Sequence, residues 1–221
     1  MAKHLLRDLE HIKREILSVG GLVEQAIHRA TTAFVERRPE LADEVVAGDN
    51  EIDEREVRVE EECLKALALH QPVAADLRFI ITVLKVNNDL ERMGDLAVNI
   101  AERSRYLAKS KPTSFGPQFR AMVDAVRSMV RDSLDSLVNV DLALARRIYE
   151  RDDHVDEVHS KMYGLLQERM EADVSTIDDC ISLLSVSRHL ERIADLATNI
   201  AEDVEFMIEG EIIRHKAHPR P

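Results

Sequence analysis

The feature that most constrains the fold is a thirteen-residue stretch that occurs twice, at residues 90–102 and again at residues 190–202. Ten of the thirteen positions are identical in the two copies, and corresponding residues are always 100 positions apart. A repeat separated by about half the chain indicates a duplicated unit rather than a solenoid of short repeats. The sequence therefore predicts two similar halves of about 110 residues each.

Each copy has the pattern of an amphipathic helix. It contains no proline, and its one glycine, Gly94, is matched by Ala194 in the second copy. Because residues three and four positions apart lie on the same face of a helix, each copy carries a polar stripe beside an apolar one. The polar stripe consists of Glu91, Asp95, Asn99 and Glu102 in the first copy and of Glu191, Asp195, Asn199 and Glu202 in the second.

A second acidic motif lies in the helix that precedes each copy. Asp49 and Asp53 are four positions apart, and Asp152 and Asp156 repeat this pair 103 positions later. In an antiparallel three-helix bundle, an early site on one helix lies beside a late site on the next. We therefore expect two oxygen-rich sites, built from Asp49, Asp53, Glu91, Asp95 and Asn99 in the first half and from Asp152, Asp156, Glu191, Asp195 and Asn199 in the second.

Three interpretations of these acids stay open at this point. Aspartate and glutamate are usually exposed, so a solvated acidic face is the ordinary one. The others are a set of oxygen ligands for a hard cation and a docking surface for a cationic partner. An acidic pair one helical turn apart is mildly destabilising, so its retention in both halves favours a function. Without a cation, the crowded negative charge should raise the pKa of some of these carboxyl groups.

The ligand types narrow the choice of metal. Sites made only of oxygen ligands suit Mg, Ca or Mn, and they tolerate iron. Ferritin-like di-iron sites need Glu-x-x-His on two helices, and this motif occurs nowhere in the chain. His154 and His159 flank the second site only, and we expect both on a solvated face.

The composition favours an all-α protein and excludes several classes. Hydrophobic residues make up 45% of the chain, enough for a core, while Gly and Pro are scarce. A net charge of −12 argues against sequence-independent nucleic-acid binding, which needs a basic surface. No apolar run approaches the length of a transmembrane helix, and residues 1–8 lack the apolar segment of a signal peptide. We therefore expect a cytoplasmic protein, with Cys63 and Cys180 as reduced core residues.

Motifs of catalysis are missing from the sequence. It has no Gly-rich phosphate loop, no G-x-S-x-G and no C-x-x-C, and nothing pairs a nucleophile with a base. We therefore expect a protein that is not an enzyme.

Helix signals divide the chain into six long segments. Apolar spacing and breakers predict helices at about residues 4–37, 39–69, 72–108, 117–138, 139–172 and 175–209. The clearest linker is residues 109–117, which sets the boundary between halves at 110/111. The predicted fold is thus two three-helix bundles, residues 1–110 and 111–221, with a mobile C-terminal tail that contains His215 and His218.

Three local features sharpen this prediction. Gly20 and Gly21 interrupt the first helix, which indicates a close helix crossing or a mild kink. Asn139 or Asp141 should cap the fifth helix. The sixth should begin with a capping box from Ser175 to Asp178.

These motifs resemble those of the PhoU family, phosphate-transport accessory and regulatory proteins. The resemblance rests on residues 90–102, on residues 72–78 upstream of them and on the Asp49-x-x-x-Asp53 pair, and it extends over about residues 4–210. It implies two similar three-helix bundles related by a pseudo-two-fold axis. It also implies a negative regulator of phosphate uptake and phosphate-starvation signalling. The implied partners are the ATPase subunit of the phosphate ABC transporter and a sensor histidine kinase, and we expect a homodimer.

The resemblance further implies multinuclear iron or zinc clusters on the repeated acidic motifs, with Mg or Mn as alternatives. The second half departs from the family pattern, because residues 173–179 do not repeat residues 72–78. Occupancy or partner is therefore expected to differ between the halves. The residues expected to bind partners are Glu91, Arg92, Asp95, Glu102, Glu191, Arg192, Asp195 and Glu202.

Three functional hypotheses follow from these observations. The first is an adaptor that binds signalling and transport proteins through its acidic faces, with metal as an optional structural ligand. The second is a carboxylate protein for metal storage or redox chemistry, which the missing Glu-x-x-His disfavours. The third is a purely structural helical dimer with solvated acids.

Overall fold

The structure is a computed structural model that describes residues 2–108 and 116–211, and within these residues it is entirely helical apart from short connections. Six long helices follow one another along the chain, as predicted. They are α1 (Ala2–Glu36), α2 (Pro39–His70), α3 (Ala74–Leu107), α4 (Pro117–Asn139), α5 (Leu142–Ala172) and α6 (Ile177–Glu209), with one 3₁₀ turn, η1 (Val174–Thr176), before α6.

The helix ends confirm one predicted cap and correct another. The Asp141 carboxylate accepts a hydrogen bond of 2.9 Å from the Leu144 amide and so caps α5. Gly210 ends α6 in the left-handed conformation, with φ of 76°. The capping box predicted from Ser175 to Asp178 does not form at the α6 N-terminus. Instead the Asp173 carboxylate accepts from the Ser175 amide and caps η1, because an aspartate two residues earlier competes for the same donor.

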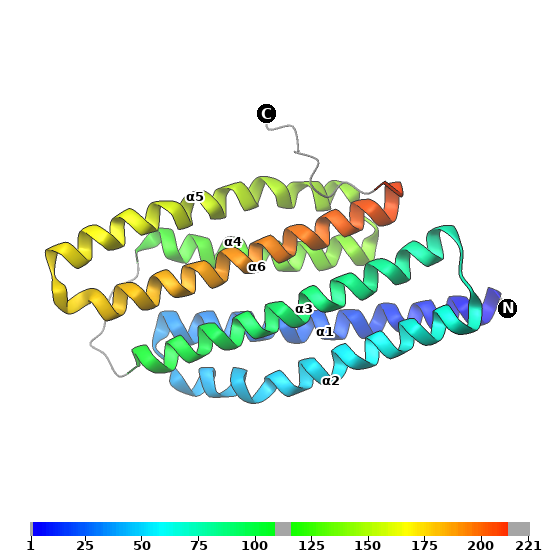
Figure 1. Cartoon of the computed structure of the whole chain (residues 1–221), viewed down its shortest axis with the longest axis horizontal. Helices are drawn as coiled ribbons and strands as arrows, with labels where there is room; N and C mark the ends of the chain where they lie inside the picture. Colours follow the sequence, from blue (N-terminus) through cyan, green and yellow to red (C-terminus); the bar gives the residue numbers. More distant parts are fainter. Residues whose placement is uncertain (1, 109–115, 212–221) are drawn as a thin grey trace.

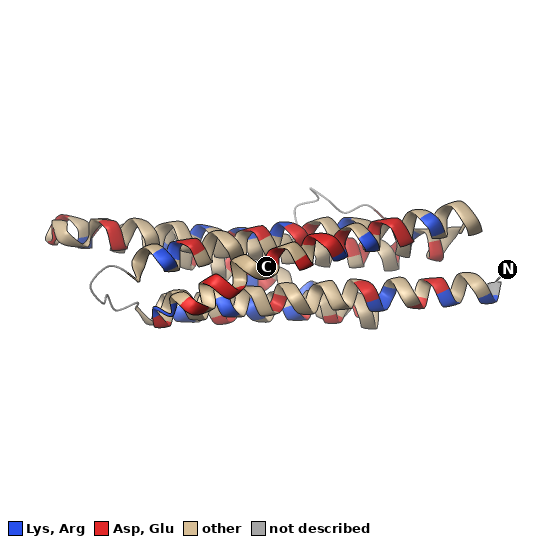
Figure 2. Ribbon diagram, turned by 90° about the horizontal axis from the view of Figure 1, so that it is seen from below, with Lys and Arg blue, Asp and Glu red and all other residues tan. Residues whose placement is uncertain are grey.

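The helices form two antiparallel bundles, α1–α3 and α4–α6, which pack against each other along α3 and α6 (Figure 1). Seen along an edge, the molecule has two layers, and α1 lies in the layer behind α2 and α3 (Figure 2). The α1 and α4 helices also contact each other. The repeated stretches sit on α3 and α6, so the duplication places both copies at the junction of the bundles. The predicted fold of two similar three-helix bundles is confirmed.

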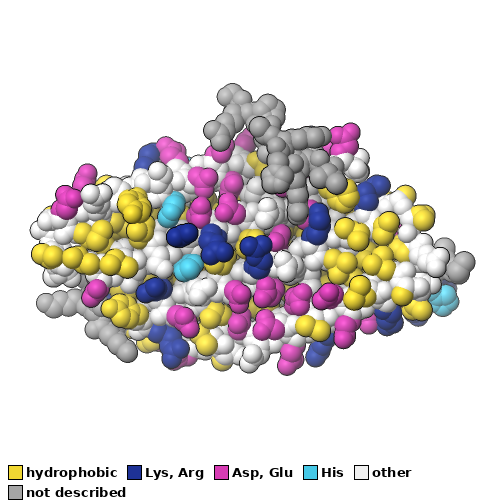
Figure 3. Space-filling model, in the orientation of Figure 1, with side chains coloured by type: hydrophobic (Ala, Val, Ile, Leu, Met, Phe, Trp, Pro, Cys, Tyr) yellow, Lys and Arg dark blue, Asp and Glu magenta, His cyan; other side chains and the backbone are white. Residues whose placement is uncertain are grey.

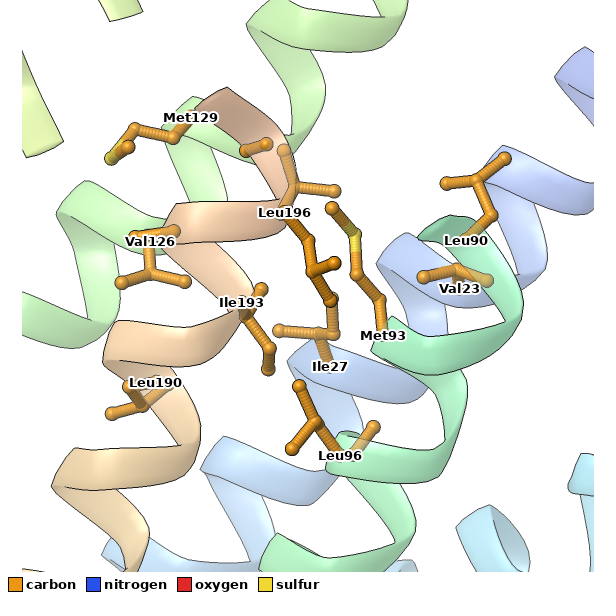
Figure 4. Packing of buried hydrophobic residues seen from close by; sticks show 14 of the residues in the cluster. Val23, Ile27, Leu90, Met93, Leu96, Val126, Met129, Leu190, Ile193 and Leu196 are labelled. Carbon is orange, nitrogen blue, oxygen red and sulfur yellow. The ribbon is translucent and has the colours of Figure 1, made fainter. Parts of the chain in front are cut away.

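One apolar core runs through both bundles. Leu90 and Met93 of α3 and Leu190 and Ile193 of α6 are fully buried, and they pack with residues of α1 and α4 (Figure 4). Leu96 and its counterpart Leu196 are buried where the repeats meet (Figure 4). Because this junction is apolar and close-packed, the two repeated motifs are held in a fixed relation to each other.

The first glycine of the α1 pair marks a close helix crossing. A Cβ atom on Gly20 would lie 2.7 Å from Leu134 Cδ1 of α4, whereas a Cβ on Gly21 would meet nothing within 4 Å. The α1 helix is continuous through both residues. Of the two predicted explanations, the structure therefore supports the close crossing.

The remaining predictions concern the domain boundary, the tail histidines, the two cysteines and the absence of a transmembrane helix. The boundary at 110/111 and the tail histidines His215 and His218 lie outside the residues that the structure describes. Cys63 and Cys180 are buried free thiols, as expected. None of the helices within residues 2–108 and 116–211 is both long and apolar enough to span a membrane.

Candidate functional site

The first carboxylate cluster lies between α2 and α3. Burial, followed by the nearby charges of Asp53 and Asp95, raises the pKa of Asp49. Burial, followed chiefly by Asp95 and Asp53, raises the pKa of Glu91. Asp49, Asp53, Glu91 and Asp95 therefore come together across the two helices, as the antiparallel arrangement predicted. We call these four residues the first cluster.

The second cluster repeats this arrangement between α5 and α6. Burial, then Asp156 and Asp195, raises the pKa of Asp152 to about 7. Burial, then Glu191 and Asp156, raises the pKa of Asp195 to about 6, although Arg192 opposes this shift. Asp152, Asp156, Glu191 and Asp195 form the second cluster. Burial, with neighbouring acids as a smaller cause, thus raises the pKa of some carboxyl groups in both halves.

The deepest carboxylate of the second cluster is incompletely satisfied. Asp152 Oδ1 is buried and has no hydrogen-bond partner among residues 2–108 and 116–211, and the same holds for the neighbouring Thr198 hydroxyl. Thr198 still lies close enough to lower the pKa of Asp152 slightly. An unpaired buried oxygen strongly favours either a proton or a cation.

Sequence reasoning missed Glu56 beside the first cluster and placed its counterpart, His159, on a solvated face. Glu56 of α2 follows Asp49 and Asp53 on the same face, and burial, Glu60 and Asp53 raise its pKa. Its position in the second half is taken by His159, whose Nδ1 lies 3.0 Å from the Ser187 hydroxyl. The prediction of a solvated His159 is therefore wrong, whereas His154 is exposed as expected. Helical spacing from Asp53 to Glu56 was the signal that could have found both positions.

The two clusters flank a groove where α3 and α6 cross. This groove has a volume of about 450 Å³ and contains the matching residues of both repeats. Its polar lining is Arg92, Asp95, Asn99, Arg192, Asp195, Thr198 and Asn199. Seen from this side, basic side chains lie between two groups of acidic ones (Figure 3). The face therefore presents a band of alternating charge across α2, α3, α6 and α5.

The groove also shows where the predicted partner-binding residues lie. Arg92, Asp95, Arg192 and Asp195 come together in it. Glu202 lines an adjoining hollow with Arg92, whereas Glu102 lines a separate one with residues of α2. Asn99 and Asn199, which were predicted as metal ligands of separate sites, both line the central groove.

The donor chemistry of the clusters fits a hard cation, although their side chains are not arranged around one. Desolvated carboxylates with raised pKa values and an unpaired oxygen of Asp152 are suited to an ion with oxygen ligands. Among residues 2–108 and 116–211, no three carboxylate, imidazole or thiol side chains converge on a point that would hold a metal ion. Metal ligation by these acids and by Asn99 and Asn199 stays a prediction.

Comparison with known proteins identifies relatives over nearly the whole chain. The family model of the PhoU domain matches residues 16–104 and again residues 119–204. A protein of Aquifex aeolicus (strain VF5) described as "Phosphate-specific transport system accessory protein PhoU homolog" is 41% identical over 212 residues, which are 96% of each chain. A Caulobacter vibrioides protein of the same description is 36% identical over 216 residues, covering 96% of this chain and 94% of its own.

Solved structures agree with these relatives. PhoU from Pseudomonas aeruginosa superposes with a TM-score of 0.89 at 34% identity, covering 93% of this chain and 99% of that one. The phosphate transport system regulatory protein PhoU from Streptococcus pneumoniae superposes with a TM-score of 0.85 at 28% identity, covering 94% and 98%. The six helices and their repeat are thus shared with both.

Proposed function

This chain belongs to the PhoU family, and from that premise we propose that it is a cytoplasmic, non-enzymatic adaptor that restrains phosphate uptake and phosphate-starvation signalling. Its proposed partners are the ATPase subunit of a phosphate ABC transporter and a sensor histidine kinase. The relatives named above are described as accessory proteins of the phosphate-specific transport system, which supports a role beside the transporter. A homodimer stays a prediction, which light scattering of the purified protein would test.

The single observation that carries the proposal is the pair of carboxylate clusters on one face, in which half-buried acids lie beside exposed ones. Six carboxyl groups around these sites have raised pKa values, namely those of Asp49, Glu56, Glu91, Asp152, Asp156 and Asp195. Their negative charge is held at a cost in free energy that a nearby positive charge would relieve. A basic surface on a partner protein would supply that charge and would bind with electrostatic complementarity.

A metal ion is the second source of positive charge. Iron or zinc, or alternatively Mg or Mn, would be held by the four acids of each cluster. It would neutralise the carboxylates, and in an adaptor it would bridge them to acidic or histidine side chains of a partner. In this proposal the metal supports a protein interface and takes part in no reaction.

The test is a binding titration with the cognate transporter ATPase. Wild-type protein is compared with the variants Glu91→Gln/Asp95→Asn and Glu191→Gln/Asp195→Asn, each with and without chelator. A matched control, Glu10→Gln/Glu168→Gln, removes two exposed carboxylates outside both clusters. We expect at least one cluster variant to lose about tenfold or more in affinity while the control binds normally.

The outcomes separate the parts of the proposal. Loss in one cluster variant alone assigns the partner surface to that half, and loss on adding chelator makes the metal part of it. Unchanged binding in both cluster variants would place the interface elsewhere and refute the role proposed for the acids.

A further inference from the structure

The groove between α3 and α6 has two ends that the pseudo-two-fold axis should make equivalent. Each end is built from the middle of one repeat helix and the last turns of the other. Residues of α3 and α6 correspond at an offset of 100, so the two ends can be compared position by position. This internal comparison shows what each end is built to hold.

At the first end, basic and acidic side chains neutralise one another. This end is a hollow of about 660 Å³ that includes Lys85, Asn88, Asp89 and Arg92. The Lys85 ammonium donates to Asp203 Oδ1 at 2.5 Å, and Arg92 lies 3.7 Å from Asp89. Both cations of α3 therefore have a carboxylate beside them.

At the second end, the residues that supply this negative charge are replaced. The counterpart of Asp89 is His189, and the counterpart of Asp203 is Arg103. The counterpart of Asn88 is Arg188. Arg192 repeats Arg92, but it has no acid in the place that Asp89 takes beside Arg92. The counterpart of Lys85 is Ser185, which removes one positive charge. Together these four differences leave three arginines and turn a balanced end into a basic one.

The structure brings these basic groups together around His189. Arg188 and Arg192 are one turn apart on the exposed face of α6, and Arg103 approaches from α3. Burial, then the charges of Arg192, Arg103 and Arg188, lowers the pKa of His189. Left of the centre of the face in Figure 3, basic side chains and histidines gather over α3 and α6.

The charges of this basic group are only partly balanced by acids in the part of the chain that the structure describes. Within residues 2–108 and 116–211, Arg103, Arg188 and Arg192 form no salt bridge, although the chain carries a net charge of −12. His189 Nδ1 is buried and unpaired in the same part of the chain, and its Nε2 lies 3.4 Å from the Ser185 hydroxyl. Asp195 therefore offsets part of the charge of Arg192, whereas Arg103 and Arg188 have no acid within salt-bridge distance among the described residues.

We propose that Arg103, Arg188 and Arg192 form an anion site at this end of the groove, which takes a doubly charged phosphate-type oxyanion. The anion is either free inorganic phosphate or the phosphoryl group of a phosphate monoester. Guanidinium groups on two helices present donors from several directions, and this suits a tetrahedral dianion better than a single carboxylate. The site has the opposite charge to the two carboxylate clusters and lies between them.

The proposal is tested by titrating the full chain with inorganic phosphate and, separately, with phosphoserine. Chloride at matched ionic strength is the reference, and binding is followed by calorimetry and by the NMR signals of the His189 ring. The variants Arg188→Asn and Arg103→Asp install the residue of the first end at each position. The control Arg147→Asn removes an exposed arginine of α5 away from the groove.

We expect saturable binding of at least one phosphate compound, with a shift of the His189 signals. Each site variant should lower the affinity by roughly tenfold or more, and Arg147→Asn should leave it unchanged. Binding of inorganic phosphate supports a free ligand, and binding of phosphoserine alone supports a phosphoryl group. The proposal is overturned if neither compound saturates, or if Arg147→Asn weakens binding as much as the site variants. Thermal melts establish that the exposed substitutions leave the fold intact.

Discussion

The two carboxylate clusters come from one duplicated motif, yet they differ in their electrostatics. In the second cluster, the pKa reaches about 7 for Asp152 and about 6 for Asp195. In the first, burial and neighbouring charge raise the pKa of Asp49 and Glu91 in the same direction. The second cluster also contains a buried carboxylate oxygen, on Asp152, that has no hydrogen-bond partner in the part of the chain that the structure describes.

The acidic motif alone therefore does not set the pKa values of its carboxyl groups. The four acids are matched in the two halves, but the residues around them are not. Glu56 in the first half is replaced by His159, and Val98 is replaced by Thr198. These replacements act against the difference, because Thr198 lowers the pKa of Asp152 and His159 lowers that of Asp156. The largest cause of the raised pKa of Asp152 is its burial.

The largest effect that sharpens this comparison is expected from metal binding. Adding Mn²⁺ or Zn²⁺ at about a hundredfold excess over its dissociation constant should stabilise the protein by about 2.7 kcal/mol. Asp152→Asn/Asp195→Asn should remove more of this stabilisation than Asp49→Asn/Asp95→Asn, because the second cluster gains more from neutralisation. Thermal melts measure the effect, with Glu168→Gln as the control. If both cluster variants lost the same metal-induced stabilisation, the two clusters would contribute equally to metal binding, contrary to this prediction.

Removing the most perturbed charge should stabilise the metal-free protein. Asp152→Asn is expected to raise the free energy of unfolding by about 2 kcal/mol at about pH 8, because an ionised carboxylate leaves a partly desolvated site. Asp49→Asn should have a smaller effect of the same sign. Urea unfolding in the presence of chelator measures both. If Asp152→Asn instead destabilised the chain, the ionised Asp152 carboxylate would have to be stabilised by an interaction that is absent from the described residues.

The pH dependence of stability should follow the second cluster. An acid whose pKa is higher in the folded chain than in the unfolded chain binds its proton more tightly when folded. Its contribution is therefore complete below the ordinary value of 3.8 and is lost as the pH rises through about 6 for Asp195 and about 7 for Asp152. Metal-free protein should lose roughly 1–2 kcal/mol between about pH 5 and about pH 8.

Two variants resolve this loss into the contributions of the clusters. Asp152→Asn/Asp195→Asn should flatten the profile, whereas Asp49→Asn/Glu91→Gln should keep most of it. A profile that is flattened equally by both would show that the two clusters are electrostatically equivalent.

The smallest effect concerns the position at which the first repeat has Gly94 and the second has Ala194. Ala194→Gly should destabilise α6 by about 1 kcal/mol, since glycine costs more entropy in a helix. Gly94→Ala should change stability by less than about 0.5 kcal/mol, because its Cβ would lie 3.3 Å from Ile52 Cδ1 and this crowding offsets the helical gain. Chemical unfolding of both variants tests the pair, and a gain of about 1 kcal/mol in Gly94→Ala would show that Ile52 adapts freely.

Much of this architecture follows from the sequence for a physical reason. The repeat and the helical periodicity predict six helices and two bundles, because the apolar stripe must be buried. The approach of Asp49 to Asp95 follows from antiparallel packing alone. The pattern could not show that α3 and α6 share one core through Leu96 and Leu196, because an apolar stripe predicts that a helix face is buried but not which helix it packs against. It also missed Glu56, and it placed His159 on a solvated face because the contact of His159 with Ser187 is made across two helices.

The central claim is that the carboxylate clusters bind a partner through charge, and the salt dependence of that binding tests it most directly. The affinity for the transporter ATPase is measured from about 50 to about 500 mM salt for wild type and for the two double variants of Glu91 with Asp95 and Glu191 with Asp195. The account predicts a wild-type affinity that falls about tenfold or more over this range, and a shallower slope in at least one variant. A wild-type affinity that does not change with salt would contradict it.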